Sequence, residues 1–194
     1  MMRRSLAILT TTFALALGAG AHAAEGTGPD NVVQAETTGS NVTDVHSKLK
    51  LGSYSGDNLQ SENVASAYSH DCTDCRTAAV AVQAVFVTNS PSTSEPKNVA
   101  VALNERCLRC TTFAFAYQYV VPTDGPVHLD AETRADIRRL RHEVADVAHS
   151  DLAPPDMDAR LHDLSTEFKS EIDTGLARAG EHPHGHVREQ QKDQ

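Results

Sequence analysis

One stretch of the chain occurs twice, and this duplication constrains the fold more than any other feature. Residues 63–85 align without a gap with residues 98–120, 35 positions later, and 11 of the 23 aligned residues are identical. The two copies hold all four cysteines of the chain, as two Cys-x-x-Cys pairs: Cys72 and Cys75, then Cys107 and Cys110. The fold of this region must therefore accommodate one supersecondary unit used twice.

The pattern of identities predicts that each copy is made of strands. After each cysteine pair, the residues that the copies share fall on alternate positions, which is the period of a strand face. They are Thr77, Ala79, Ala81, Gln83 and Val85, matched by Thr112, Ala114, Ala116, Gln118 and Val120. The positions between them are small in the first copy and large in the second, which suits two strands that pack against each other.

The segments before the cysteines alternate as well, so each copy is predicted to be a hairpin with its cysteine pair at the bend. Because both faces of the second strand are apolar, we expect it to be central in its sheet. We predict an α+β fold: a small antiparallel β-sandwich or barrel built from the duplicated hairpin, followed by a C-terminal αα-hairpin. The predicted divisions are a signal peptide (1–23), a flexible lead-in (24–46), the β domain (47–124), the helical hairpin (125–179) and a disordered, histidine-containing tail (180–194).

The first residues resemble an export signal. Arg3 and Arg4 precede a short apolar stretch at 6–17, and Ala21-His22-Ala23 has the small-x-small pattern of a cleavage site. The apolar stretch is too short for a stable membrane span. We therefore predict a secreted or extracytoplasmic chain with no stable membrane span after cleavage. The formal net charge of −9 argues against nucleic-acid partners, which require clustered Lys and Arg.

Two amphipathic helices are predicted after the β domain. Asp130 is a suitable N-cap, and the apolar residues that follow are spaced three and four apart up to about His149. Pro154 and Pro155 then end one helix and start the next. The apolar faces of the two helices consist of Ile137, Leu140, Val144 and Val147, and of Met157, Leu161, Leu164, Phe168, Ile172 and Leu176.

The two cysteine pairs allow three interpretations. In an oxidising compartment, structural disulfides are the first. The second is a tetrahedral zinc site with four thiolate ligands, so zinc is the alternative cofactor. The third is thiol-disulfide exchange, but the predicted strand after each pair would not supply the helix dipole that activates such thiols. Closing a loop of about 35 residues stabilises by roughly 4 kcal/mol and a four-residue ring by only about 2, which favours bridges between the repeats, from Cys72 to Cys107 or to Cys110.

The repeated motif also resembles a known group of proteins. The run Asn-Val-Ala-x-Ala, Cys-x-x-Cys and x-Thr-x-Ala-x-Ala-x-Gln-x-Val, present twice within 63–121, is similar to extracytoplasmic actinobacterial segments described as, or attached to, peptide zinc metalloproteases. The chain lacks the His-Glu-x-x-His motif of such proteases, since His142-Glu143 and His149 have the wrong spacing. The resemblance therefore implies an accessory domain and transfers no catalytic residue.

No combination of residues predicts a catalytic site. His182, His184 and His186 are weak candidates for binding a transition metal within a polar tail, and His70 lies close to Cys72 in the sequence. We predict a secreted, disulfide-stabilised binding or structural protein that is not an enzyme. Its partner would be an unidentified protein or a cell-surface component. The alternatives are a zinc-binding domain accessory to peptide processing and, third, a thiol-disulfide exchange protein.

Overall fold

Three stacked units of two long strands each form the body of the protein. The computed structural model describes residues 28–180 and 188–193. We call each unit a rung. In a rung the first long strand reverses through a short arc into the second, and rungs one and two each end in a short third strand. The strands are β1 (Asn31–Ser40), β2 (Thr43–Tyr54) and β3 (Asn58–Leu59); β4 (Glu62–Thr73), β5 (Arg76–Thr88) and β6 (Thr93–Ser94); and β7 (Lys97–Glu105) and β8 (Thr111–Thr123).

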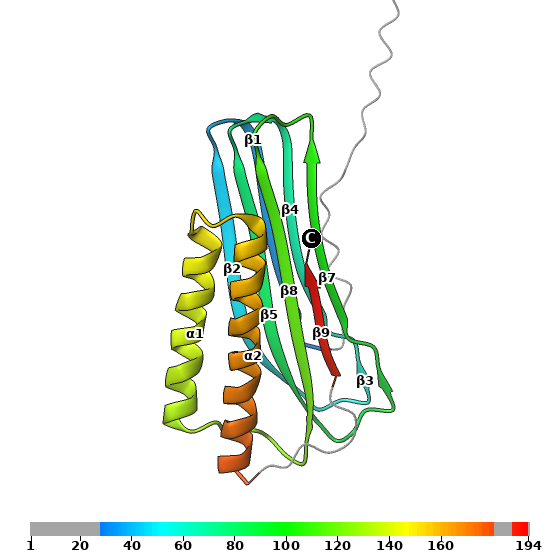
Figure 1. Cartoon of the computed structure of the whole chain (residues 1–194). Coiled ribbons are helices and arrows are strands. Elements are labelled where there is room, and N and C mark those ends of the chain that lie inside the picture. Colours follow the sequence, from blue (N-terminus) through cyan, green and yellow to red (C-terminus); the bar gives the residue numbers. More distant parts are fainter. Residues whose placement is uncertain (1–27, 181–187, 194) are drawn as a thin grey trace, which may run out of the picture.

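Equivalent strands of successive rungs pair in parallel (Figure 1). The first strands form the sheet β1-β4-β7, and the second strands form β2-β5-β8-β9. The repeat of 35 residues sets the register, since Asn63 pairs with Asn98 and Ala79 with Ala114. The α+β class is confirmed, but the antiparallel hairpin is wrong: the two long strands of a rung lie in different sheets and do not pair with each other, and no closed barrel is found in the described part.

A further rung precedes the two that the sequence repeat revealed. Residues 31–46, which we predicted to be part of a flexible lead-in, form β1 and the start of β2. Asn31 pairs with Asn63 in β4, and Gly39 occupies the position of Cys72. This rung escaped detection because it lacks both cysteines and is offset from the next rung by 32 residues at Asn31 and 33 at Gly39, with a bulge between them.

Two different cores explain the alternating pattern of the repeats. The shared small residues, such as Ala79 and Ala114, lie in an alanine-rich layer between the two large sheets. The other face of β5 and β8 packs under the helices, with Phe115 and Tyr117 among its buried residues. Small and large residues of the two copies, such as Ala78 and Phe113, are thus lateral neighbours in one sheet rather than facing partners, which corrects our packing expectation. The expectation that this strand is buried on both faces is confirmed.

The two helices cover the outer face of the β2-β5-β8 sheet (Figure 1). Helix α1 (Ala131–His149) begins at the predicted N-cap, where Asp130 accepts a hydrogen bond of 2.7 Å from the backbone N–H of Thr133. Helix α2 (Pro154–Arg178) begins at the two prolines. All ten apolar residues of the predicted stripes are buried, so the predicted hairpin is confirmed. No helix in residues 28–180 is both long and apolar enough to cross a membrane.

Part of the predicted disordered tail forms a strand. Strand β9 (Arg188–Asp193) pairs antiparallel with β8, with Gln190 opposite Gln118. A polar sequence can form this strand because β8 already presents an edge with unpaired N–H and C=O groups. The predicted signal peptide (1–23) and the candidate ligands His182, His184 and His186 lie outside the described residues.

Candidate functional site: a cluster of four cysteines at the arcs

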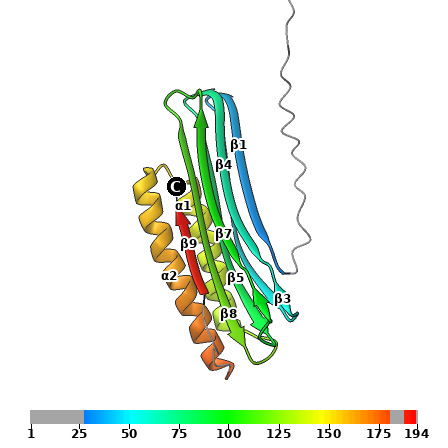
Figure 2. The same ribbon diagram turned by 90° about the vertical axis from the view of Figure 1, so that its right-hand side faces the viewer.

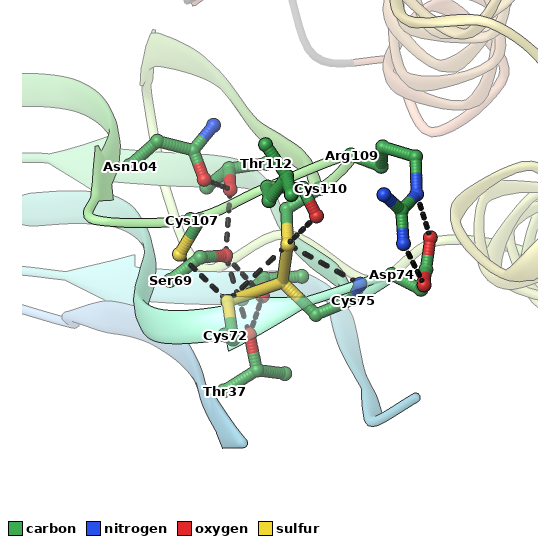
Figure 3. The surroundings of a disulfide bond; sticks show 12 residues. Thr37, Ser69, Cys72, Asp74, Cys75, Asn104, Cys107, Arg109, Cys110 and Thr112 are labelled. Carbon is green, nitrogen blue, oxygen red and sulfur yellow. Dashed lines mark hydrogen bonds and ion pairs between the residues drawn. A yellow bond between two sulfur atoms is a disulfide. The ribbon is translucent and has the colours of Figure 1, made fainter. Parts of the chain in front are cut away.

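The cysteines lie where rungs two and three turn from one sheet to the other (Figure 3). Each cysteine follows a residue with positive φ: Asp71 at 48°, Asp74 at 54°, Arg106 at 51° and Arg109 at 57°. Left-handed residues reverse the chain within a few positions, although they are unfavourable for side chains other than Gly, Asn and Asp. The same reversal in both rungs places the two Cys-x-x-Cys pairs one above the other.

Ion pairs between the rungs hold these left-handed residues in place. The guanidinium of Arg106 contacts both carboxylate oxygens of Asp71 at 2.6 and 2.9 Å, and Arg109 contacts both of Asp74 at 2.6 Å. Hydrogen bonds from Arg106 hold the pKa of Asp71 at about 2, and Arg109 lowers the pKa of Asp74. Both pairs join residues 35 positions apart, so they support the register of the two arcs.

All four sulfur atoms converge on one point. Their separations are within 4.8 Å, and Cys72 Sγ lies 2.6 Å from Cys107 Sγ and 3.3 Å from Cys110 Sγ. Cys75 Sγ is at bonding distance from both Cys72 and Cys110, whose Cα atoms are 6.3 and 4.6 Å from its own. Because one sulfur atom forms only one disulfide, the cluster is compatible with more than one pairing. Both Cα separations lie within the range of disulfides.

The cluster is polar on its inner side and partly open on its outer side. Cys72 and Cys75 are buried, whereas Cys107 and Cys110 are half-buried. The backbone N–H of Cys75 donates to Cys110 Sγ at 3.3 Å. Below the sulfur atoms, hydroxyl groups form a chain in which Ser69 lies 2.6 Å from both Thr77 and Thr112. Half-burial of the third-rung cysteines leaves a path for a reductant or a metal ion to reach the sulfur atoms.

This geometry suits disulfide formation and zinc binding, and it lacks a feature that would activate a thiol for thiol-disulfide exchange. Four thiols this close can form two disulfides, or can bind one tetrahedral zinc ion, whose Zn–S bonds of about 2.3 Å place the sulfur atoms roughly 3.8 Å apart. Thiol-disulfide exchange needs an activated thiolate. Both pairs lead into strands, β5 and β8, rather than into helix N-termini. The prediction that a strand follows each cysteine pair is therefore confirmed.

Neither His70 nor the segment of α1 that holds His142, Glu143 and His149 joins this cluster. His70 turns to the outer face of its sheet, where it stacks on Tyr68 with ring centroids 4.8 Å apart and lies 3.0 Å from Glu36. On α1, Glu143 pairs with Arg139 and Arg160. Among the residues that the structure describes, the four cysteines are the one group of His, Cys, Asp and Glu side chains arranged to hold a metal ion.

Sequence reasoning missed a buried ladder of amides that runs through all three rungs. Asn31 donates to Asn63 at 2.9 Å, and Asn63 donates to Asn98 at 2.7 Å. Beside it, Gln118 donates to Gln83 at 3.1 Å. All five side chains are buried. The recurrence of Asn at the start of each copy was the available signal, because a polar residue repeated at an inward position needs a partner in the next rung.

Comparison with known proteins gives no relative for this chain. No protein-family model, curated protein or solved structure matches it.

Proposed function

We propose that the chain is a secreted structural or binding protein whose stacked rungs are locked by disulfides at the arcs. The observation that supports this most is the alignment of the two cysteine pairs, one rung apart, with all four sulfur atoms within 4.8 Å. Export would place these thiols in an oxidising compartment, where such contacts become bonds. The proposal of export rests on Arg3, Arg4 and the Ala21-His22-Ala23 pattern in the sequence.

The favoured pairing joins Cys72 to Cys107 and Cys75 to Cys110. Each of these bridges closes a loop of 35 residues and ties the third rung to the second. In a stack, a rung contacts only its neighbours, so a terminal rung separates most easily. A bridge of this kind restricts the conformations of the unfolded chain and so stabilises the folded protein by roughly 4 kcal/mol. A bridge within one Cys-x-x-Cys pair stabilises it by only about 2 kcal/mol.

Mass spectrometry of the protein from its native compartment tests the disulfides. We expect no thiol to react with an alkylating reagent until a reductant is added, and four to react afterwards. Trypsin separates Cys107 from Cys110 by cleaving after Arg109, and a protease that cleaves before Asp74 separates Cys72 from Cys75. Peptides joining Cys72 to Cys107 and Cys75 to Cys110 would support the favoured pairing. Four reactive thiols without reductant would overturn the proposal.

A zinc-binding domain accessory to peptide processing is the second candidate. It is favoured by the compactness of the four-sulfur cluster, which matches the donor set of a structural zinc site. The resemblance of the repeats to segments associated with peptide zinc metalloproteases agrees with an accessory role. In the same experiment, four reactive thiols together with one zinc ion per chain in the native mass spectrum would establish this candidate instead.

A further inference from the structure

The ends of a stack of rungs expose strand edges. Among the described residues, three of the four long end strands have partners for at least one outward backbone group. Strand β8 is paired with β9. On β1, the outward N–H of Glu36 donates to Asp44 Oδ2 at 2.8 Å. On β2, the carbonyl of Leu49 accepts from Arg141 of α1 at 3.3 Å. Strand β9 protects the edge of β8 from pairing with other chains, whereas the contacts on β1 and β2 each occupy one outward backbone group.

Strand β7 is the exception. Within residues 28–180 and 188–193, no strand pairs with its outer edge. The backbone N–H of Lys97 points to β4, where it donates to Ser61, so the N–H groups at alternate positions, beginning with Asn98, point outward. The outer face of β7 is apolar, with Val99, Val101 and Leu103 exposed by 39, 43 and 52%. An open edge with an apolar face is a pairing site for another strand.

The space beside β7 suits one strand rather than a whole rung. Strand β9 already occupies the position beyond β8, so a second molecule cannot continue both sheets (Figure 2). The side chains of β7 that point inward include Asn98 and Ala100, which are buried. Asn98 donates to the carbonyl of Gln190 in β9 at 2.9 Å. A strand added beside β7 would therefore lie over β9 of the facing sheet. A strand added here would need small side chains on its inward face.

We propose that the outer edge of β7 binds an extended segment of a partner protein, as an added parallel strand. The segment carries small residues at the inward positions, as β4 does, and apolar residues at the outward positions. Its backbone pairs with the outward-pointing N–H and C=O groups of β7, and its outward side chains extend the rows that end at Val99, Val101 and Leu103. This deepens the proposed binding role and does not depend on how the cysteines pair.

A peptide copied from the chain itself tests the proposal. In β4, residues 63–70 (Asn-Val-Ala-Ser-Ala-Tyr-Ser-His) pair with the edge of β1 that faces the next rung, from Asn31 opposite Asn63 onwards. The outer edge of β7 is the equivalent edge one rung further along, so the peptide is suited to pair with it. Added to the isotope-labelled full-length protein, it should shift the amide resonances of Asn98, Ala100 and Ala102. We expect Val101→Lys to weaken binding by at least about tenfold, because it places a charge in the apolar row. A scrambled peptide should not bind.

Val32→Lys is the matched control, because Val32 is exposed to a similar degree (48%) on the same face but lies on β1. It should leave the affinity unchanged. A thermal melt verifies that each variant is folded, and Leu103→Lys replaces Val101→Lys if that variant unfolds. Unchanged spectra at millimolar peptide would refute the proposal, and so would a loss of affinity in Val32→Lys as large as that in Val101→Lys. Either result would leave the disulfide proposal unaffected.

Discussion

At the scale of single residues, the amide ladder carries the strongest constraint on the stack. Asn63 donates to three acceptors, namely Asn98 Oδ1 at 2.7 Å, the carbonyl of Ala81 at 3.0 Å and the carbonyl of Tyr117 at 3.1 Å. These bonds join β4 to its neighbour β7 and to both β5 and β8 in the facing sheet. One side chain thus connects two rungs and two sheets.

Replacing Asn63 should therefore destabilise the protein more than the loss of a small side chain would suggest. In Asn63→Ala, the buried side-chain oxygen of Asn98 loses its donor, the buried carbonyls of Ala81 and Tyr117 lose a donor each, and the amide of Asn31 loses one of its three acceptors. We expect a loss of roughly 2–4 kcal/mol in the free energy of unfolding, because buried polar groups without partners are costly. Urea denaturation measures it. Gln34→Ala, at an exposed position of β1, is the control and should change stability little; an equal loss in both variants would contradict the role of the ladder.

The arcs should contribute an acid-sensitive part of the stability. The folded-state pKa of Asp71 is about 2, below its value in an unfolded chain, because Arg106 binds the charged form. A lowered pKa means that the contribution is complete above about pH 4 and is lost as the pH falls towards 2. Unfolding measured between pH 5 and 2 should show a smaller decline in Asp71→Asn than in the parent protein. Identical profiles would show that this ion pair does not contribute.

At the scale of elements, the helical hairpin is a cover for a parallel sheet. Strands β5 and β8 are apolar on both faces, and only one face is covered by the opposite sheet. The helices bury the other face through side chains such as Leu140 and Phe168, which are completely buried. Parallel sheets need such covers, because both of their faces are usually buried.

Truncating a central side chain of this contact should strongly destabilise the protein. We expect Phe168→Ala to lower the free energy of unfolding by about 3–5 kcal/mol, since it leaves a cavity between α2 and the sheet. Thermal and urea unfolding measure the effect. Leu152→Ala, in the exposed loop between the helices, is the control and should cost little. If both variants were equally stable, the hairpin would not pack on the sheet as described.

At the scale of the whole molecule, the protein is a short stack whose last rung is closed by a strand of opposite direction. Strand β9 runs antiparallel to β8, whereas the other pairings of the long strands are parallel. It is also polar, and its backbone at Gln190 accepts from Asn98, the last amide of the ladder. These features indicate that β9 ends the β2-β5-β8 sheet at the third rung of the described stack.

Weakening β9 should therefore promote self-association. Gln190→Pro removes a backbone N–H and is incompatible with regular strand pairing, so it should expose the edge of β8. We expect the variant to form concentration-dependent oligomers in size-exclusion chromatography with light scattering, while Lys192→Ala, which keeps the strand, stays like the parent. A monomeric Gln190→Pro protein at all concentrations would show that β9 is not needed to protect this edge.

Local sequence patterns were sufficient for the elements but not for their neighbours. The alternation from Thr77 to Val85 identified a strand with two buried faces, and Asp130 with the double proline identified both helix starts. Alternation reports which face a side chain occupies, and it does not report which strand lies beside it. Parallel pairing across 35 residues, the first rung with its Gly39 in place of a cysteine, and the pairing of β9 are therefore matters of long-range contact.

For the cysteine site, too, one part follows from the sequence repeat and another part from long-range contacts. The repeat alone assigns the four cysteines to equivalent turns of a duplicated unit, because each copy carries its Cys-x-x-Cys at the same position. That both turns stack at one end, with four sulfur atoms within 4.8 Å of one another, emerges only in the folded chain. The physical reason is that sequence spacing sets the length of each arc, whereas the distance between arcs depends on the register of strands that are far apart in the chain.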